Sequence, residues 1–283
     1  MSTREPDRTR RTLQRLARSA KIEIIPVRGV EEKLAGVPTG TTVTITCSTR
    51  FGLERTLRYT ELAAQAGFRV VPHLAARQVT DEGQLQDFVG RIGEWGVRDL
   101  FVIGGDVTDP VGRFGSAAEL LDSLAGLDHR IESIGVACYP EGHQSIPDDD
   151  LVEALQRKQA HAQYMVSQLC FDPAVLVGWL RRVRALGVKL PLHIGLAGPL
   201  HARKLAELSL KIGVGSSLRY LTKQHGLLGR LLRGTAHRPE RLVLGIGADL
   251  GSAELAIEAL HLFSFNQIDG TVEWQRAVAG PSS

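Results

Sequence analysis

The stretch Asp81–Asp106, DEGQLQDFVGRIGEWGVRDLFVIGGD, contains one helix followed by one strand. Acidic side chains at Asp81 and Glu82 stand where the helix would begin, and negative charge is favourable at that end of a helix. Gly96 follows the helical segment in the manner of a C′ glycine, and Val97–Gly104 is an apolar run typical of a buried strand. The stretch therefore predicts a helix that leads directly into a buried strand.

The same alternation continues along the rest of the chain, where short apolar runs alternate with helical patterns such as Leu53–Ala66 and Ala174–Leu186. The expected strands are Lys21–Pro26, Thr42–Ser48, Phe68–Ala75, Val97–Gly104, Ser133–Tyr139, Tyr164–Cys170, Pro191–Ala197 and His261–Asn266. Strict alternation requires a parallel sheet, and eight such units close into a barrel more naturally than into an open sheet. The expected fold class is α/β, a (βα)8 TIM barrel. The long, mostly helical stretch 199–260 predicts extra helices between the seventh and eighth strands.

Length and charge agree with one domain. The chain has 283 residues, and a TIM barrel typically needs roughly 250. We expect a basic N-terminal tail or helix over 1–20 and a single barrel catalytic domain over 21–283. Residues 1–21 hold six Arg and one Lys against Glu5 and Asp7, which is a net charge of +5. Since the formal charge of the whole chain is +3, the remaining residues carry −2. The nearly neutral remainder argues against a nucleic-acid partner.

The basic start lacks the apolar core of a secretory signal, and an organelle transit peptide stays open although two acids lie within it. No apolar run approaches the length of a membrane span, so no membrane partner is expected. Cys47, Cys138 and Cys170 form no CxxC pair and lie in strand-like runs, which is typical of reduced, buried thiols. We therefore expect a cytoplasmic protein.

Polar side chains gather where the expected strands end, and in a TIM barrel these ends form the active site. They are Glu23 and Pro26, Thr46–Thr49, His73, Gly104–Asp106, Tyr139–His143, Gln168 and Asn266. A carboxylate inside a barrel strand is more often functional than structural, which singles out Glu23. Asp106 suits a turn equally well, and His193 and His261 suit core or rim positions better than a site. No metal-ligand spacing is present, so no metal is expected.

Several of these segments resemble the methylenetetrahydrofolate reductase family. Its most specific motifs are similar to Cys138–His143, with the sequence CYPEGH, and to Ser167–Asp172, with the sequence SQLCFD. Weaker matches are Ile22–Pro26, Val71–Leu74, Gly105-Asp106, Arg157-Lys158 and Phe263–Asn266. The resemblance runs from about residue 21 to 278, in the family's order.

The resemblance implies interconversion of 5,10-methylenetetrahydrofolate and 5-methyltetrahydrofolate, with NAD(P)H as reductant and bound FAD as carrier. It gives Glu23 the role of general acid, places Asp106 beside the pterin and the flavin, and places Gln168 and Thr46 at the folate. The residues that it places at the flavin are His73, Gly105, Tyr139, His143, Arg157 and Lys158.

Elementary chemistry agrees with these roles. Opening the methylene bridge needs a proton, and desolvation on an apolar strand favours the protonated form of a carboxyl such as Glu23. The resulting iminium is a cation, which an ionised Asp106 can stabilise. The Gln168 amide can both donate to and accept from a pterin edge. No side chain donates hydride, so a cofactor must supply it.

Departures from the family's pattern fall on the flavin and nicotinamide side, at Gly104, Leu151, Ala154 and the loop Gly213–Ser217. They leave open a flavin-free reductase, one that runs in the oxidative direction, and a methyl-transferring or non-catalytic folate-binding barrel. The apolar stripe Leu227–Leu232 indicates an extra helix that is a possible homo-oligomer contact.

Overall fold

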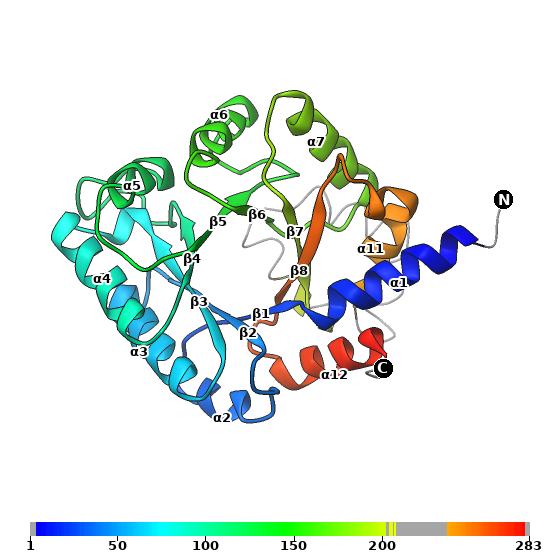
Figure 1. The fold of residues 1–283 in the computed structure, drawn as a ribbon, viewed down its shortest axis with the longest axis horizontal. Coiled ribbons are helices and arrows are strands. Elements are labelled where there is room, and N and C mark those ends of the chain that lie inside the picture. Colours follow the sequence, from blue (N-terminus) through cyan, green and yellow to red (C-terminus); the bar gives the residue numbers. More distant parts are fainter. Residues whose placement is uncertain (1–3, 202–203, 206, 208–236, 281–283) are drawn as a thin grey trace.

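The computed structural model describes residues 4–201, 204–205, 207 and 237–280, and within them the chain forms a closed barrel of eight parallel strands (Figure 1). The strands follow each other around the barrel in chain order, and β8 pairs with β1 to close it. The predicted α/β TIM-barrel fold is therefore confirmed.

The strands lie close to their expected positions. They are β1 Lys21–Ile24, β2 Thr42–Ile45, β3 Arg69–Ala75, β4 Asp99–Ile103, β5 Ser133–Cys138, β6 Tyr164–Ser167, β7 Leu192–Ala197 and β8 Ile257–Phe263. Only β8 is displaced, since it begins four residues before the expected His261. Ile257 pairs with Leu192 of β7, next to a bulge, and this pairing with a distant strand recruits residues that carry little strand signal of their own.

Helices surround the barrel (Figure 1). They are α1 Arg4–Arg18, α2 Val30–Leu34, α3 Gly52–Gln65, α4 Glu82–Glu94, α5 Ala117–Leu124, α6 Asp148–Lys158, α7 Pro173–Ala185, α11 Glu240–Ile246 and α12 Ile268–Ala279, with 3-10 turns η1 Ala76–Gln78 and η2 Gly247–Gly251. The Asp81 carboxylate caps α4 by accepting from the backbone N–H of Gln84 at 2.8 Å, and Gly96 after α4 has φ 78°. Both end signals of the opening stretch are confirmed. No described helix is both long and apolar enough to cross a membrane.

The basic N-terminal segment forms α1, which packs against α12 and η2 through the buried Leu13, Leu16 and Ala17. In Figure 1 this dark-blue helix lies beside the orange α11 and the red α12. Between β7 and β8 the structure describes α11 and η2, as expected for extra helices. The candidate flavin-side loop Gly213–Ser217 and the stripe Leu227–Leu232 lie outside the described residues.

Alternation along the strands separates two faces. Ile22 and Ile24 of β1 point outward into the main core and are fully buried, while Lys21 and Glu23 point into the barrel. The barrel interior holds a small apolar cluster that includes Val71, Phe101, Tyr164 and Val166. The three cysteines are buried, as the sequence predicts. The polar side chains of Lys21 and Glu23 therefore lie in a barrel interior that also contains an apolar cluster.

Gly195 of β7 provides a test of barrel packing. A Cβ at this position would lie 2.1 Å from the backbone oxygen of Ser167 and 2.6 Å from the Phe263 ring. Gly195→Ala should therefore lower the free energy of unfolding by about 2–3 kcal/mol, measured by chemical denaturation. Gly90→Ala on α4 is the control, because a Cβ there meets nothing within 4 Å and alanine favours a helix by up to about 1 kcal/mol. Equal stability of the two variants would contradict the packing described for β7.

Candidate active site

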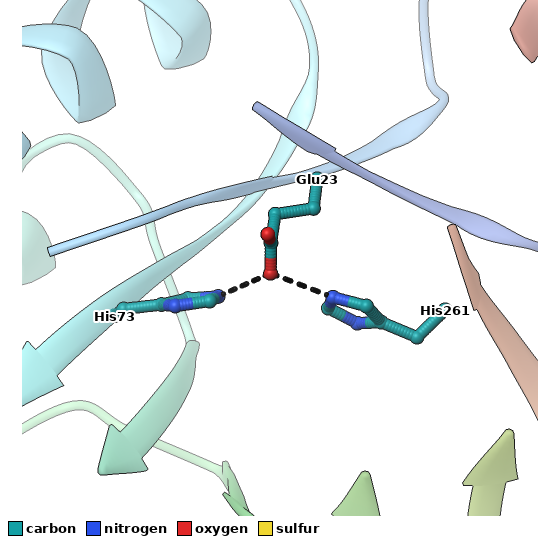
Figure 2. Close-up of side chains that lie close together, drawn as sticks. All are labelled: Glu23, His73 and His261. Atoms are coloured by element: carbon teal, nitrogen blue, oxygen red, sulfur yellow. Dashed lines mark hydrogen bonds and ion pairs between the residues drawn. The ribbon is translucent and has the colours of Figure 1, made fainter. Parts of the chain in front are cut away.

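A carboxylate and two imidazoles meet inside the barrel (Figure 2). Oε2 of Glu23 on β1 lies 3.0 Å from Nε2 of His261 on β8, which is a hydrogen bond. Nε2 of His73 on β3 lies 3.7 Å from the same oxygen, which is an ion-pair distance and longer than a hydrogen bond. The side chain of Glu23 is 12% exposed, so the carboxylate is largely shielded from water. These three residues form the acid–histidine cluster.

The end of β8 holds β1 in place at the cluster. The Ser264 hydroxyl donates to the backbone carbonyl of Glu23. The Asn266 side chain accepts from the backbone N–H of Ile25 at 2.8 Å and donates to its carbonyl at 2.9 Å. Phe265 and Asn266 both have positive φ, 47° and 61°, which turns the chain so that the amide reaches β1. Residues that follow β8 therefore hold the backbone from the carbonyl of Glu23 to that of Ile25.

The surroundings of His73 keep its ring neutral. Burial lowers its pKa to about 4, and the charge of Glu23 only partly opposes this effect. The ring lies 4.7 Å from that of Phe101, centroid to centroid. At neutral pH His73 thus places an uncharged imidazole beside the carboxyl of Glu23.

The cluster has the composition of a metal site, since one ligand-type atom from each residue lies within 4.8 Å of the others. Metal-binding histidines almost always donate their second ring N–H to another group. Nδ1 of His261 is buried and has no hydrogen-bond partner, while its Nε2 is already bonded to Glu23. The geometry suits an acid–base cluster better than a metal centre, and the absence of a metal stays a prediction.

The residues expected at the folate follow three strands of the same barrel. Thr46 follows β2, and its hydroxyl is buried without a hydrogen-bond partner, as is that of Thr44. Gln168 follows β6 and is half-buried, with its side-chain oxygen accepting from the N–H of Leu169 at 2.9 Å. Asp106 is exposed in the loop after β4. Thr46 and Asp106 follow β2 and β4, which neighbour strands of the cluster, whereas Gln168 follows β6, which is next to β5 and β7.

Gly105 packs the Asp106 loop against β3, and Tyr139 lies near enough to feel the charge of Asp106. Gly105 has φ 91°, and a Cβ there would lie 3.1 Å from that of Ala75, so the loop packs closely on β3. Burial raises the pKa of Tyr139 to about 12, with smaller contributions from Cys138 and from the charge of Asp106. The Tyr139 ring meets the ring of His143 edge-on at 5.2 Å. Tyr139 and His143 thus form a ring pair on the side of the barrel where Asp106 lies.

Arg157 and Lys158, expected at a flavin pyrophosphate, have other partners. Arg157 forms an exposed ion pair with Asp122 of α5 at 3.4 Å. Lys158 is buried, and its Nζ donates to the carbonyl of Ala137 at 2.9 Å. Burial lowers the pKa of Lys158 to about 8. The structure therefore does not bring these two cations together with Tyr139 and His143.

A second polar group lies nearer the start of the strands. Nζ of Lys21 stands 4.0 Å above the Tyr164 ring, and that ring stacks on His193 with centroids 4.1 Å apart. Burial lowers the pKa of Lys21 to about 8, with Asp99 opposing. Burial also lowers the pKa of His193 well below its usual value, and the charges of Lys21 and His261 add to the effect. The polar interior of the barrel thus continues past the cluster.

Sequence reasoning missed His261 and the role of Ser264. The signal was present in the alternation of Leu260–Phe263, which puts His261 and Phe263 on one face of the strand and the leucines on the other. In a barrel that face is the interior, so His261 was a candidate as strong as His73. Its closeness to Glu23, 238 residues away, depends on barrel closure.

The fold and this site define a (βα)8 barrel with a shielded acid–histidine cluster among its strand ends. A family model described as methylenetetrahydrofolate reductase matches residues 29–209. The chain belongs to the methylenetetrahydrofolate reductase family.

Individual relatives match shorter segments. Methylenetetrahydrofolate reductase 1 of Schizosaccharomyces pombe is 28% identical over 134 residues, 44% of this chain and 22% of that protein. Methylenetetrahydrofolate reductase 2 of Saccharomyces cerevisiae is 34% identical over 68 residues, 23% of this chain and 11% of that protein. The matches thus span less than a quarter of either relative. A crystal structure of 2,3-dimethylmalate lyase shares the fold, with a TM-score of 0.50 and 11% identity over 98% of this chain and 86% of the lyase.

Lys21 predicts a pH dependence of stability. Its pKa is about 8 in the folded chain and 10.5 when unperturbed, so the unfolded chain binds more protons between these values. The free energy of unfolding should therefore rise with pH across this window, by roughly 2–3 kcal/mol from this residue.

Chemical denaturation at pH 7 to 10.5 measures this contribution as the difference between the wild type and Lys21→Met. The rise should be smaller in Lys21→Met by this amount, although the buried Lys158, whose pKa is also lowered to about 8, still contributes. Lys189→Met, at an exposed position, should keep the full rise. Parallel curves for the wild type and Lys21→Met would show that Lys21 is not desolvated.

Proposed function

We propose that this chain reduces 5,10-methylenetetrahydrofolate to 5-methyltetrahydrofolate with hydride from NAD(P)H. The supporting observation is Glu23, a shielded carboxyl hydrogen-bonded to His261 among the strand ends of a barrel that belongs to this family. The overall reaction consumes one proton and one hydride for each folate. Glu23 supplies the proton.

Glu23 donates its proton to the bridge nitrogen that leaves, which opens the five-membered ring and produces an iminium cation. When the proton has left, the His261 N–H stabilises the carboxylate of Glu23. The hydrogen bonds from Ser264 and Asn266 keep the backbone of β1 in place. The hydride then adds to the iminium carbon.

Asp106 and Gln168 complete the folate site of this proposal. Asp106 provides a negative charge near the cation, which lowers the energy of the charged intermediate. Gln168 meets the amide-like edge of the pterin, to which its side chain can both donate and accept. Thr46 and Thr44 offer buried hydroxyls without partners, and a bound folate would satisfy them.

FAD as hydride carrier is part of the proposal through the family resemblance, and its ring would lie near Gly105, Tyr139, His143 and His73. Lys158 as it lies does not fit a pyrophosphate contact, because it is buried against the Ala137 carbonyl. Arg157 faces the carboxylate of Asp122. The same contacts favour a second candidate, a flavin-free reductase in which NAD(P)H passes hydride directly to the folate.

The visible absorption spectrum of the purified chain distinguishes the two forms. A flavin absorption that NAD(P)H bleaches supports FAD as the carrier. A colourless chain that oxidises NAD(P)H only when methylenetetrahydrofolate is present supports direct transfer. A colourless chain that binds folate without turnover would instead support the non-catalytic or methyl-transferring alternative and overturn the reductase proposal.

Glu23→Gln tests the acid. The amide keeps the shape and a hydrogen bond but donates no proton, so kcat should fall by about 10²–10⁴-fold while folate affinity stays close to that of the wild type. Glu258→Gln, at an exposed position on β8, is the matched control and should keep full activity. Steady-state kinetics and folate titration measure both effects. A Glu23→Gln variant with wild-type turnover would remove Glu23 from the mechanism.

A further inference from the structure

The polar interior of the barrel extends from Glu23 toward the start of the strands. Lys21 and Glu23 are two residues apart on β1 and point to the same side. His261 lies directly beside Lys21 in the β1–β8 register, and His193 lies on β7, the other neighbour of β8. Four titratable side chains on three adjacent strands thus share the barrel interior.

His261 is placed between the acid and this inner group. Its Nε2 is bonded to Glu23 at 3.0 Å, and its Nδ1 is buried without a hydrogen-bond partner. Nδ1 of His193 is also buried without a partner, and His193 lies on β7, where it pairs with Ala259 of β8, two residues before His261. Buried polar atoms are rarely left unsatisfied, and a water between polar groups is the usual partner.

The proposed reaction requires that a proton returns to Glu23 after each turnover. Each turnover removes one proton from Glu23 while the folate lies over the strand ends. The carboxylate must regain a proton before the next turnover, and the charged and titratable groups of the inner layer are Lys21, Asp99, Tyr164 and His193. Of these groups, Lys21 has a pKa of about 8 and can exchange protons near neutral pH.

We propose that His261 returns the proton to Glu23 from inside the barrel, through a water held between its Nδ1 and Nδ1 of His193. This inference rests on the proposed function.

In the proposed transfer, a proton moves from Nε2 of His261 to the Glu23 carboxylate, and Nδ1 of His261 takes a proton from the water. The water regains its proton from solvent through the inner layer, so one solvent proton enters for each one given to the folate. Exchange with solvent restores the starting tautomer of His261 after product release. His261 acts through Glu23 and is a positioning residue that also passes the proton.

Two substitutions separate passing a proton from holding the carboxyl. His261→Gln offers an amide N–H that can hold Glu23 but cannot relay a proton, and His261→Ala offers neither. Both variants should lower kcat by about 10–100-fold with little change in KM. Their kcat should also fall more steeply with rising pH than that of the wild type. Added imidazole should restore part of the rate of His261→Ala and leave the wild type unchanged.

Control measurements show whether the variants are folded and whether the loss of rate is specific to the proton transfer through His261 and His193. His161→Gln, which changes a histidine paired with Asp122 on the outside of the barrel, should keep wild-type kinetics. Circular dichroism and folate binding should be unchanged in every variant. His193→Phe can keep a ring stacked on Tyr164 but removes both nitrogens, and it should slow turnover in the same direction.

Several results would overturn the relay. A wild-type rate for His261→Gln would leave His261 only the task of holding Glu23, and a wild-type rate for His193→Phe would remove the inner path. One equivalent of metal in the purified wild type that is lost in His261→Ala would make the cluster a metal site. A wild type without turnover would remove the proposed function, and the relay with it, whereas normal variants of an active wild type would remove the relay alone.

Discussion

The seam between β1 and β8 is the constraint on which the site depends. Barrel closure brings the first strand of the chain against the last, and Glu23 then meets His261 at hydrogen-bond distance. The backbone contacts from Ser264 and Asn266 cross the same seam. An open sheet with the same strands would leave both sides of this seam as edges, and the acid would be exposed to water and without its partner.

The acid–histidine cluster is stable in the barrel because its charges are few. Burial keeps the ring of His73 neutral at physiological pH, so the carboxyl does not face two cations. An unpaired buried charge is expensive, whereas an uncharged imidazole beside a carboxyl can share a proton at little cost. The aromatic rings of Phe101 and Phe263 pack against the two histidines and limit the access of water. The carboxyl of Glu23 is therefore largely separated from solvent.

The residues proposed for the folate and those proposed for the flavin differ in whether they already have a hydrogen-bond or ion-pair partner. Thr44 and Thr46 have buried hydroxyls that lack a protein partner, while Arg157 and Lys158 already have one. A surface ion pair such as Arg157–Asp122 contributes little and can rearrange, but Lys158 would have to leave a buried hydrogen bond. The contacts of the chain's own residues therefore support the folate assignment more strongly than the flavin assignment.

The sequence by itself determined the strand–helix alternation, seven of the eight strand positions to within a few residues, and the place of Glu23 on a buried strand. These features are local, since they depend on apolar periodicity, helix-end residues and a carboxyl on a buried strand. Only the tertiary structure decided the partner of Glu23, the early start of β8, and the direction in which Lys158 points. Each of these depends on contacts between residues far apart in the chain, and local patterns carry no information about which distant side chains barrel closure will bring together.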